Sequence, residues 1–433
     1  MTTINSDYRE YKLDNGLVVA FQSTSAQTVV AKLRINYGSS HEKEGEEGLA
    51  HFLEHCLVTG GSSKYDPITA DSIRCSFGYS NAFTNIGRTN FIGQILSEDL
   101  ESWLDYTSDH VFRPRFDRDR VNGERERVLR EISDRKSNPV YSAQMEFNNI
   151  FYREHPKGRF NLGKEEIVRN ATQEVIGGFH KRGYSPNNMD LIIVGGLLNN
   201  VDELIRNYFE NFPIGQDTRK NFPELKNLSD KYLIHTSAPE KLNSDKPDDS
   251  SAHIFLGYLG PVSGHEDEFA VRTMNQILGG DTSSLLFQNV GLKKGLAYRA
   301  YVSYNGSYNC GELGINANVP TRRIDEAIDA IFQEIQRMKT ERISDKFIER
   351  IKKMVRFNLA KTFEFNEGYV NAIESKLDYG LTPELIIEGY NRVTSDKVIG
   401  AANKYLPDRE TGKYVLNIRD PLKSNLSKIY PFY

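Results

Sequence analysis

The sequence contains little of what would mark it as a secreted or membrane protein. Its 433 residues include only three cysteines, Cys56, Cys75 and Cys310, an odd number at wide spacing. This pattern argues against a disulfide framework and for a reducing compartment. No run approaches the roughly 18 apolar residues of a membrane-spanning helix, and the first residues resemble neither a signal peptide nor a transit peptide. We therefore expect a cytoplasmic protein with no membrane partner.

An excess of charge of one sign is also missing. The chain carries 55 lysines and arginines against 59 aspartates and glutamates, a formal net charge of −4, and the two signs are interspersed. Such a chain has no field that would attract nucleic acid, so nucleic acid is not expected as a partner. With 38% hydrophobic residues the chain can fold, and its length favours two domains of roughly 200 residues each.

The order of strand-like and helix-like patterns predicts an α+β protein. Alternating apolar runs flank the turn signal Asp14-Asn15-Gly16, and helical patterns follow. A polar stretch over residues 216–250 is the candidate linker, and after it the order of elements broadly repeats. We predict two related αβ domains, residues 1–215 and 251–433, each a mostly antiparallel sheet packed with helices.

The sequence does contain one segment with the chemistry of a metal site, His51-Phe52-Leu53-Glu54-His55. At about 100° per residue, the two histidines lie within about 40° of each other on a helix, and Glu54 flanks the same stripe. Apolar residues occupy the opposite arc. Two imidazoles and a carboxylate so placed can bind a catalytic zinc ion and accept a proton from its water. The order H-x-x-E-H is that of the inverzincins; a surface helix with two solvated histidines is the alternative.

A catalytic zinc site needs a third protein ligand. The helix-like stretch 122–132 offers Glu124, Glu126 and Glu131. Glu124 and Glu131 are seven residues apart and share a face within about 20°, whereas Glu126 points elsewhere. Spacing does not choose among the three glutamates. Each of them could equally be a solvated side chain with partners four residues away.

Taken together, these segments resemble the pitrilysin-like M16 metallopeptidases, most closely the M16B branch with the mitochondrial processing peptidase beta subunit and many bacterial peptidases. The resemblance covers nearly the whole chain, and its matching segments are residues 13–17, 48–55, 81–84, 130–131, 184–189, 277–280, 284–287 and 295–298. It implies the two-domain fold of the processing peptidases and one Zn²⁺ per chain. It also implies endopeptidase activity on short or unfolded peptides.

The resemblance further implies the roles of individual residues. The family's third zinc ligand is a glutamate that follows an arginine about 76 residues after the second histidine, which corresponds to Glu131. His51, His55 and Glu131 are thus the implied metal ligands, and Glu54 is the implied general base. Glu124 matches an acidic residue that orients a ligand or tunes the site.

On the substrate side, the resemblance implies that an extended peptide pairs with the strand of Asn81, Ala82 and Phe83. The family also uses an arginine and a tyrosine from the second domain. The tyrosine matches Tyr298, but Gly291 stands where the arginine should be. We hypothesise a dimer in which a homologous subunit supplies the Arg/Tyr pair. A homodimer with a shifted loop is the alternative.

Two other functions share the same fold. One is a non-catalytic, structural core-type subunit, which would need none of the zinc-site residues. The other is a dedicated protease that removes one leader peptide. The sequence does not separate the latter from general peptide degradation.

Overall fold

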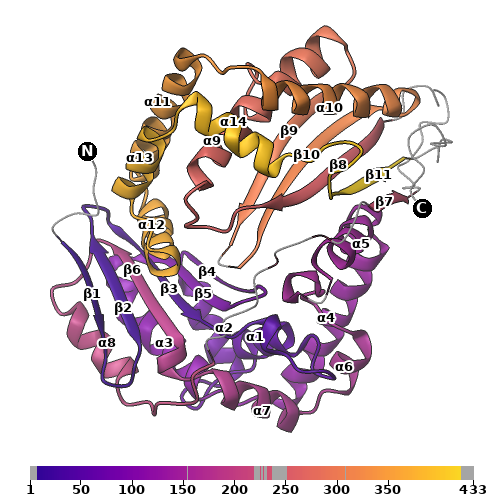
Figure 1. Ribbon diagram of the computed structural model, residues 1–433. Helices are drawn as coiled ribbons and strands as arrows, with labels where there is room; N and C mark the ends of the chain where they lie inside the picture. The colour runs from indigo at the N-terminus through magenta and orange to yellow at the C-terminus, as the bar shows by residue number, and fades with distance from the viewer. Residues whose placement is uncertain are drawn as a thin grey trace. The chain divides into compact units, whose positions relative to one another are not determined.

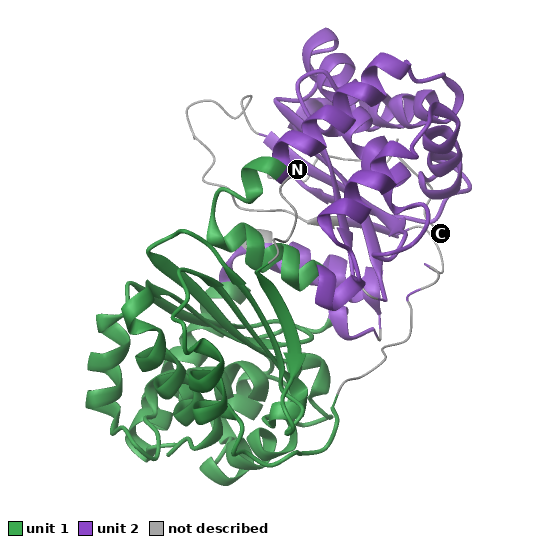
Figure 2. Cartoon of the chain, turned by 90° about the vertical axis from the view of Figure 1, so that its left-hand side faces the viewer, with its two compact units in different colours: residues 1–136, 159–221, 360–375 green, residues 137–158, 222–359, 376–433 purple. Residues whose placement is uncertain are grey.

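The computed structural model describes residues 7–153, 155–218, 225, 228, 232–236, 251–307 and 309–420. The chain forms two compact units, and each unit contains segments from both halves of the sequence (Figure 2). Unit 1 comprises residues 1–136, 159–221 and 360–375, and unit 2 comprises residues 137–158, 222–359 and 376–433. Each unit contains one mixed sheet and several helices, so the predicted α+β class is confirmed.

The sheet of unit 1 has six strands in the order β1-β2-β6-β3-β5-β4 (Figure 1). The strands are β1 (Tyr8–Lys12), β2 (Val18–Ser23), β3 (Thr28–Ile35), β4 (Tyr79–Thr84), β5 (Thr89–Leu96) and β6 (Met189–Gly195). All neighbouring pairs are antiparallel except β2 and β6, which are parallel. Strand β4 therefore lies at one edge of the sheet.

Seven of the described helices of unit 1 pack on one face of its sheet (Figure 2). They are α1 (Leu49–Thr59), α2 (Pro67–Ser76), α3 (Leu100–Phe112), α4 (Arg118–Ser137), α6 (Glu165–Asn170), α7 (Gln173–Gly183) and α8 (Val201–Phe209). The period of two along β3 explains this arrangement, because Leu33 and Ile35 point into the helix-side core whereas Lys32 and Arg34 point to the other face. The alternation of apolar and charged side chains along β3 thus determines which face of the sheet packs against these helices.

The other face of the same sheet is tied to a helix from late in the sequence, α12 (Asn366–Tyr379). The Asn366 side chain donates to the backbone oxygen of Thr28 at 2.9 Å. About two turns further along the helix, the carboxylate of Glu374 lies 2.6 Å from the ammonium of Lys32. The first part of α12 therefore belongs to unit 1, although it lies in the second half of the chain.

Unit 2 has a five-stranded sheet in the order β7-β11-β8-β10-β9. Its strands are β7 (Tyr232–Thr236), β8 (Ser251–Gly260), β9 (Arg299–Gly306), β10 (Gly311–Pro320) and β11 (Val415–Arg419). Its helices are α5 (Pro139–Tyr152), α9 (Glu268–Gly279), α10 (Ile324–Thr340), α11 (Asp345–Thr362), α13 (Pro383–Asn391) and α14 (Ser395–Tyr405). Residues Leu286–Lys293 form a π-helix, a rare form of helix that is frequently found at functional sites.

Helix α5 shows the reverse of what is seen for α12. It comes from the first half of the chain but packs in unit 2. Its Phe147 and Phe151 lie in a core cluster with Val415 of β11, and the Asn417 side chain donates to the backbone oxygen of Ala143 at 3.0 Å. Packing therefore does not follow the two contiguous segments of the sequence. The predicted boundaries stay a prediction, because most of the predicted linker 216–250 lies outside the described residues.

Within the part of the chain that the structure describes, we find no helix with the length and apolarity needed to cross a membrane.

Candidate metal centre

The start of helix α1 packs closely against the backbone at Leu162 and Gly163. Gly48 precedes it with φ +103°, a conformation that favours glycine, and a Cβ atom there would lie 2.7 Å from the backbone oxygen of Leu162. From Leu49 onward the helix buries its apolar side chains, including Phe52 and Leu53, in the core of unit 1. The opposite face turns His51, Glu54 and His55 toward β4 and α4. These side chains are not solvated: His51 and Glu54 are buried and His55 is partly buried.

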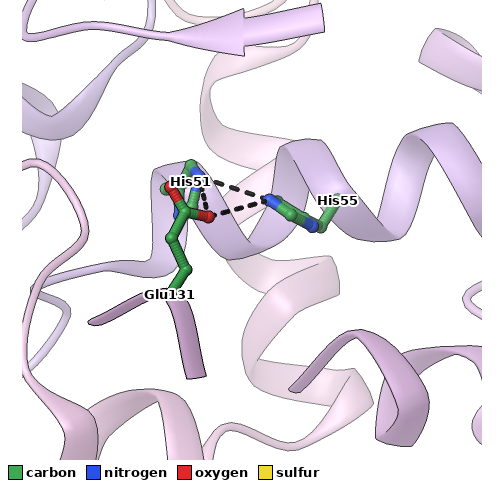
Figure 3. Close-up of side chains that lie close together, drawn as sticks. All are labelled: His51, His55 and Glu131. Carbon is green, nitrogen blue, oxygen red and sulfur yellow. Dashed lines mark hydrogen bonds and ion pairs between the residues drawn. The ribbon is translucent and has the colours of Figure 1, made fainter. Parts of the chain in front are cut away.

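Two helices bring the three implied ligands together (Figure 3). The Nε2 atoms of His51 and His55 are 3.3 Å apart. The Oε2 atom of Glu131, from α4, lies 3.7 Å from Nε2 of His51 and 3.9 Å from Nε2 of His55. Within the described residues, these three form the one group of metal-binding side chains whose ligand atoms all lie within 4.8 Å of one another.

The triangle of donor atoms fits a zinc ion. Tetrahedral zinc with bonds of about 2.0–2.1 Å places its ligand atoms about 3.4 Å apart, close to the 3.3–3.9 Å of these three atoms. Two histidines and one glutamate are also a known donor set of catalytic zinc. Burial, helped by the charges of His55 and Arg135, lowers the pKa of His51 to about 3. The ring is therefore neutral at pH 7, the form that binds metal.

Glu124 lies behind the second histidine rather than among the ligands. Its Oε2 atom is 2.8 Å from Nδ1 of His55. In the neutral ring, a proton on Nδ1 shared with this carboxylate would leave a lone pair on Nε2, the atom that lies near His51 and Glu131. Burial raises the pKa of Glu124, but the hydrogen bond and the charge of His55 outweigh it, so the pKa is lowered overall. Glu126 is exposed on the same helix and takes no part in this cluster.

The candidate base, Glu54, is held by the neighbouring strand. Oγ1 of Thr84, the last residue of β4, donates to Oε2 of Glu54 at 2.7 Å. Burial raises the pKa of Glu54, and the hydrogen bond with Thr84 opposes that effect. No role for Thr84 itself was predicted from the sequence. Thirty residues separate it from Glu54, and no periodicity links a strand end to a helix face.

The predicted substrate strand is β4, which pairs with β5 alone among the described strands. Its outer backbone N–H and C=O groups are thus available for an added strand. Along it, Ala82 packs against the core, whereas Asn81 and Phe83 are exposed on the alternate face, Phe83 to 41%. The ammonium of Lys32 lies 5.4 Å from the centre of the Phe83 ring.

Tyr298 and Gly291 both belong to unit 2. Tyr298 is 95% exposed and immediately precedes β9, the strand at one edge of the described sheet of unit 2. Gly291 lies inside the π-helix Leu286–Lys293, and a Cβ atom there would be 3.3 Å from the backbone oxygen of Ala297.

Comparisons with known proteins agree with this arrangement of the fold. The family model described as insulinase (peptidase family M16) matches residues 17–164, and the model described as the peptidase M16 inactive domain matches residues 170–355. The chain belongs to the M16 peptidase family. The first of these matches contains His51, Glu54, His55 and Glu131.

Similar proteins are named as zinc proteases. An uncharacterized zinc protease of Bacillus subtilis is 27% identical over 419 residues, which is 95% of this chain and 98% of the relative. One of Mycobacterium leprae is 28% identical over 383 residues, 87% of this chain and 84% of the relative. Among solved structures, a protease from Helicobacter pylori superimposes with a TM-score of 0.82 at 21% identity, covering 96% of this chain and 99% of that one. That likeness shows the shared fold.

The hydrogen bond between Glu124 and His55 predicts a measurable effect on metal binding. Glu124→Ala should weaken Zn²⁺ affinity by about 10- to 100-fold, because the ring of His55 loses the partner that orients it. Competition with a chromophoric chelator measures the affinity. Glu126→Ala is the matched control, since Glu126 is exposed on the same helix, and it should leave the affinity unchanged. Equal affinities in the two variants would contradict the role of Glu124.

Proposed function

We propose that this M16 family member is a zinc-dependent endopeptidase that hydrolyses short or unfolded peptides. The observation that carries the proposal is the placement of Nε2 of His51, Nε2 of His55 and Oε2 of Glu131 at 3.3–3.9 Å from one another. The buried carboxylate of Glu54 comes from α1, the helix that also carries the two histidines. The names of the relatives, which are called zinc proteases, support the same reading.

The residues of the chain divide the chemistry between them. His51, His55 and Glu131 would hold one Zn²⁺, which when bound lowers the pKa of a water molecule toward 7 and polarises a carbonyl group. Glu54 would accept the proton of the attacking water on its carboxylate and pass it to the leaving amine. Thr84 keeps one carboxylate oxygen of Glu54 in place through its 2.7 Å hydrogen bond. The raised pKa of Glu54 suits a group that must hold a proton between two steps.

Strand β4 would bind the substrate. An extended peptide that pairs with its free edge gains main-chain hydrogen bonds whatever its sequence, as in other cases of strand addition. Asn81 and Phe83 would then contact the side chains of the peptide, while Thr84 at the end of the strand contacts Glu54. The same strand would thus align the peptide and hold the general base. An unfolded peptide adopts the extended conformation of this pairing without first losing structure of its own.

The role of Glu54 can be tested apart from that of the ligands. Glu54→Gln should lower kcat/KM on a set of unstructured peptides by about 10²- to 10⁴-fold, because the amide cannot accept the proton. Its zinc content should stay that of the native chain, since Glu54 is not one of the three ligands. A variant that keeps both zinc and full activity would contradict the assignment. Loss of zinc together with activity would place Glu54 among the ligands instead.

We further propose that the chain acts in a dimer of the M16B type in which a homologous subunit supplies an Arg/Tyr pair. The basis is the sequence at one position, because Gly291 stands where an arginine is expected while Tyr298 is kept. A lysine nearby would not replace the forked geometry of a guanidinium. The cytoplasmic location stays a prediction from the sequence.

Replacing Gly291 tests this proposal. The isolated chain should turn over peptides slowly, and Gly291→Arg should raise its kcat/KM about tenfold or more by adding a donor for the developing negative charge. Gly291→Ala is the control for the added Cβ, which must displace the Ala297 oxygen by a few tenths of an ångström. Full turnover by the isolated chain together with an inert arginine variant would refute the shared site.

A further inference from the structure

The two histidine ligands of α1 are supported unequally. Nδ1 of His55 is hydrogen bonded to Glu124 at 2.8 Å. Nδ1 of His51 is buried, and it has no hydrogen-bond partner among the residues that the structure describes. The ring of His55 is therefore oriented by a side chain from α4, but no such contact orients the ring of His51. The position of His51 must depend on the backbone that carries it.

That backbone is the first turn of α1, where the N–H groups have no partners inside the helix. The residue at the N-cap, Gly48, has no side chain to accept from them. Glu42, from the loop before the helix, takes this place. Its Oε1 atom accepts a hydrogen bond from the N–H of Ala50 at 2.9 Å. Ala50 is the residue immediately before His51.

Glu42 is itself held firmly. It is only 5% exposed, and Nη1 of Arg159 donates to its backbone oxygen at 3.2 Å. Burial raises the pKa of the Glu42 carboxyl group to about 8; the N–H of Ala50 and the charge of Arg159 lower it, and the charge of Glu47 raises it. Without this acceptor the buried N–H of Ala50 would be left unsatisfied, which would destabilise the first turn of the helix.

We propose that Glu42 is a positioning residue for the metal centre, which fixes the first turn of α1 and thereby holds His51 in register with His55 and Glu131. The inference rests on the proposed zinc function. It differs from a general stabilising role because it acts on one ligand. His51 is the third residue of the helix and moves if the first turn frays, whereas His55 lies one turn further along and is held separately by Glu124.

The test uses Co²⁺ in place of zinc, because its visible absorption reports the geometry of the ligands. Glu42→Ala should change the intensity of the Co²⁺ bands and weaken Zn²⁺ affinity about tenfold or more, the size typical of lost support behind a ligand. Glu42→Gln, which keeps an oxygen that can accept from Ala50, should preserve the spectrum. Glu44→Ala is the control from the same loop, since Glu44 is exposed, and it should behave as native.

A folded Glu42→Ala variant with the native Co²⁺ spectrum and Zn²⁺ affinity would overturn the inference and leave the proposed function intact. A native chain that binds neither metal would overturn both. If Glu42→Ala does not fold, Glu42→Asp replaces it, because the shorter side chain withdraws the carboxylate by one methylene. The same spectral change is then expected, and its absence is again the refuting result.

Discussion

Helix α1 has to bury two opposite faces at once, and the candidate site depends on how that is achieved. One face carries Phe52 and Leu53 into the core of unit 1. The other carries two imidazoles and a carboxylate, whose burial would be costly without partners. Partners come from two other elements: Glu124 and Glu131 from α4, and Thr84 from β4. The helix, the strand edge and α4 are therefore fixed relative to one another by the polar groups of the site.

The same polar contacts join binding to chemistry. Strand β4 ends in the residue that donates to Glu54, so a peptide that pairs with β4 is aligned on the element that holds the candidate base. The two histidines are held in different ways, one through its side chain and the other through its backbone. Glu124 holds the ring of His55, and Glu42 holds the turn that carries His51. His51, Glu54 and His55 are thus each held by a residue from outside α1, which is the kind of rigidity that a preorganised site needs.

The sequence predicted the parts of this arrangement that follow from local periodicity. Helical spacing placed His51, Glu54 and His55 together, and alternation along the strands gave the α+β class. Spacing alone left Glu124, Glu126 and Glu131 equivalent, because the position of α4 against α1 is a tertiary contact. Thr84 and Glu42 were missed for the same reason. The exchange of α5 and α12 between the units was also beyond reach, since amphipathic patterning shows that a helix is buried but not against which sheet.

The most direct test of the account is the zinc content of the purified native chain compared with that of Glu131→Gln. The account predicts about one zinc per chain in the native protein, since the three donor atoms form one tetrahedral face. It predicts strongly reduced zinc in the variant, because the amide oxygen that replaces the carboxylate is a neutral and weaker ligand. A native chain without zinc after incubation with the metal would contradict the central claim. So would a Glu131→Gln variant that retains zinc with native affinity.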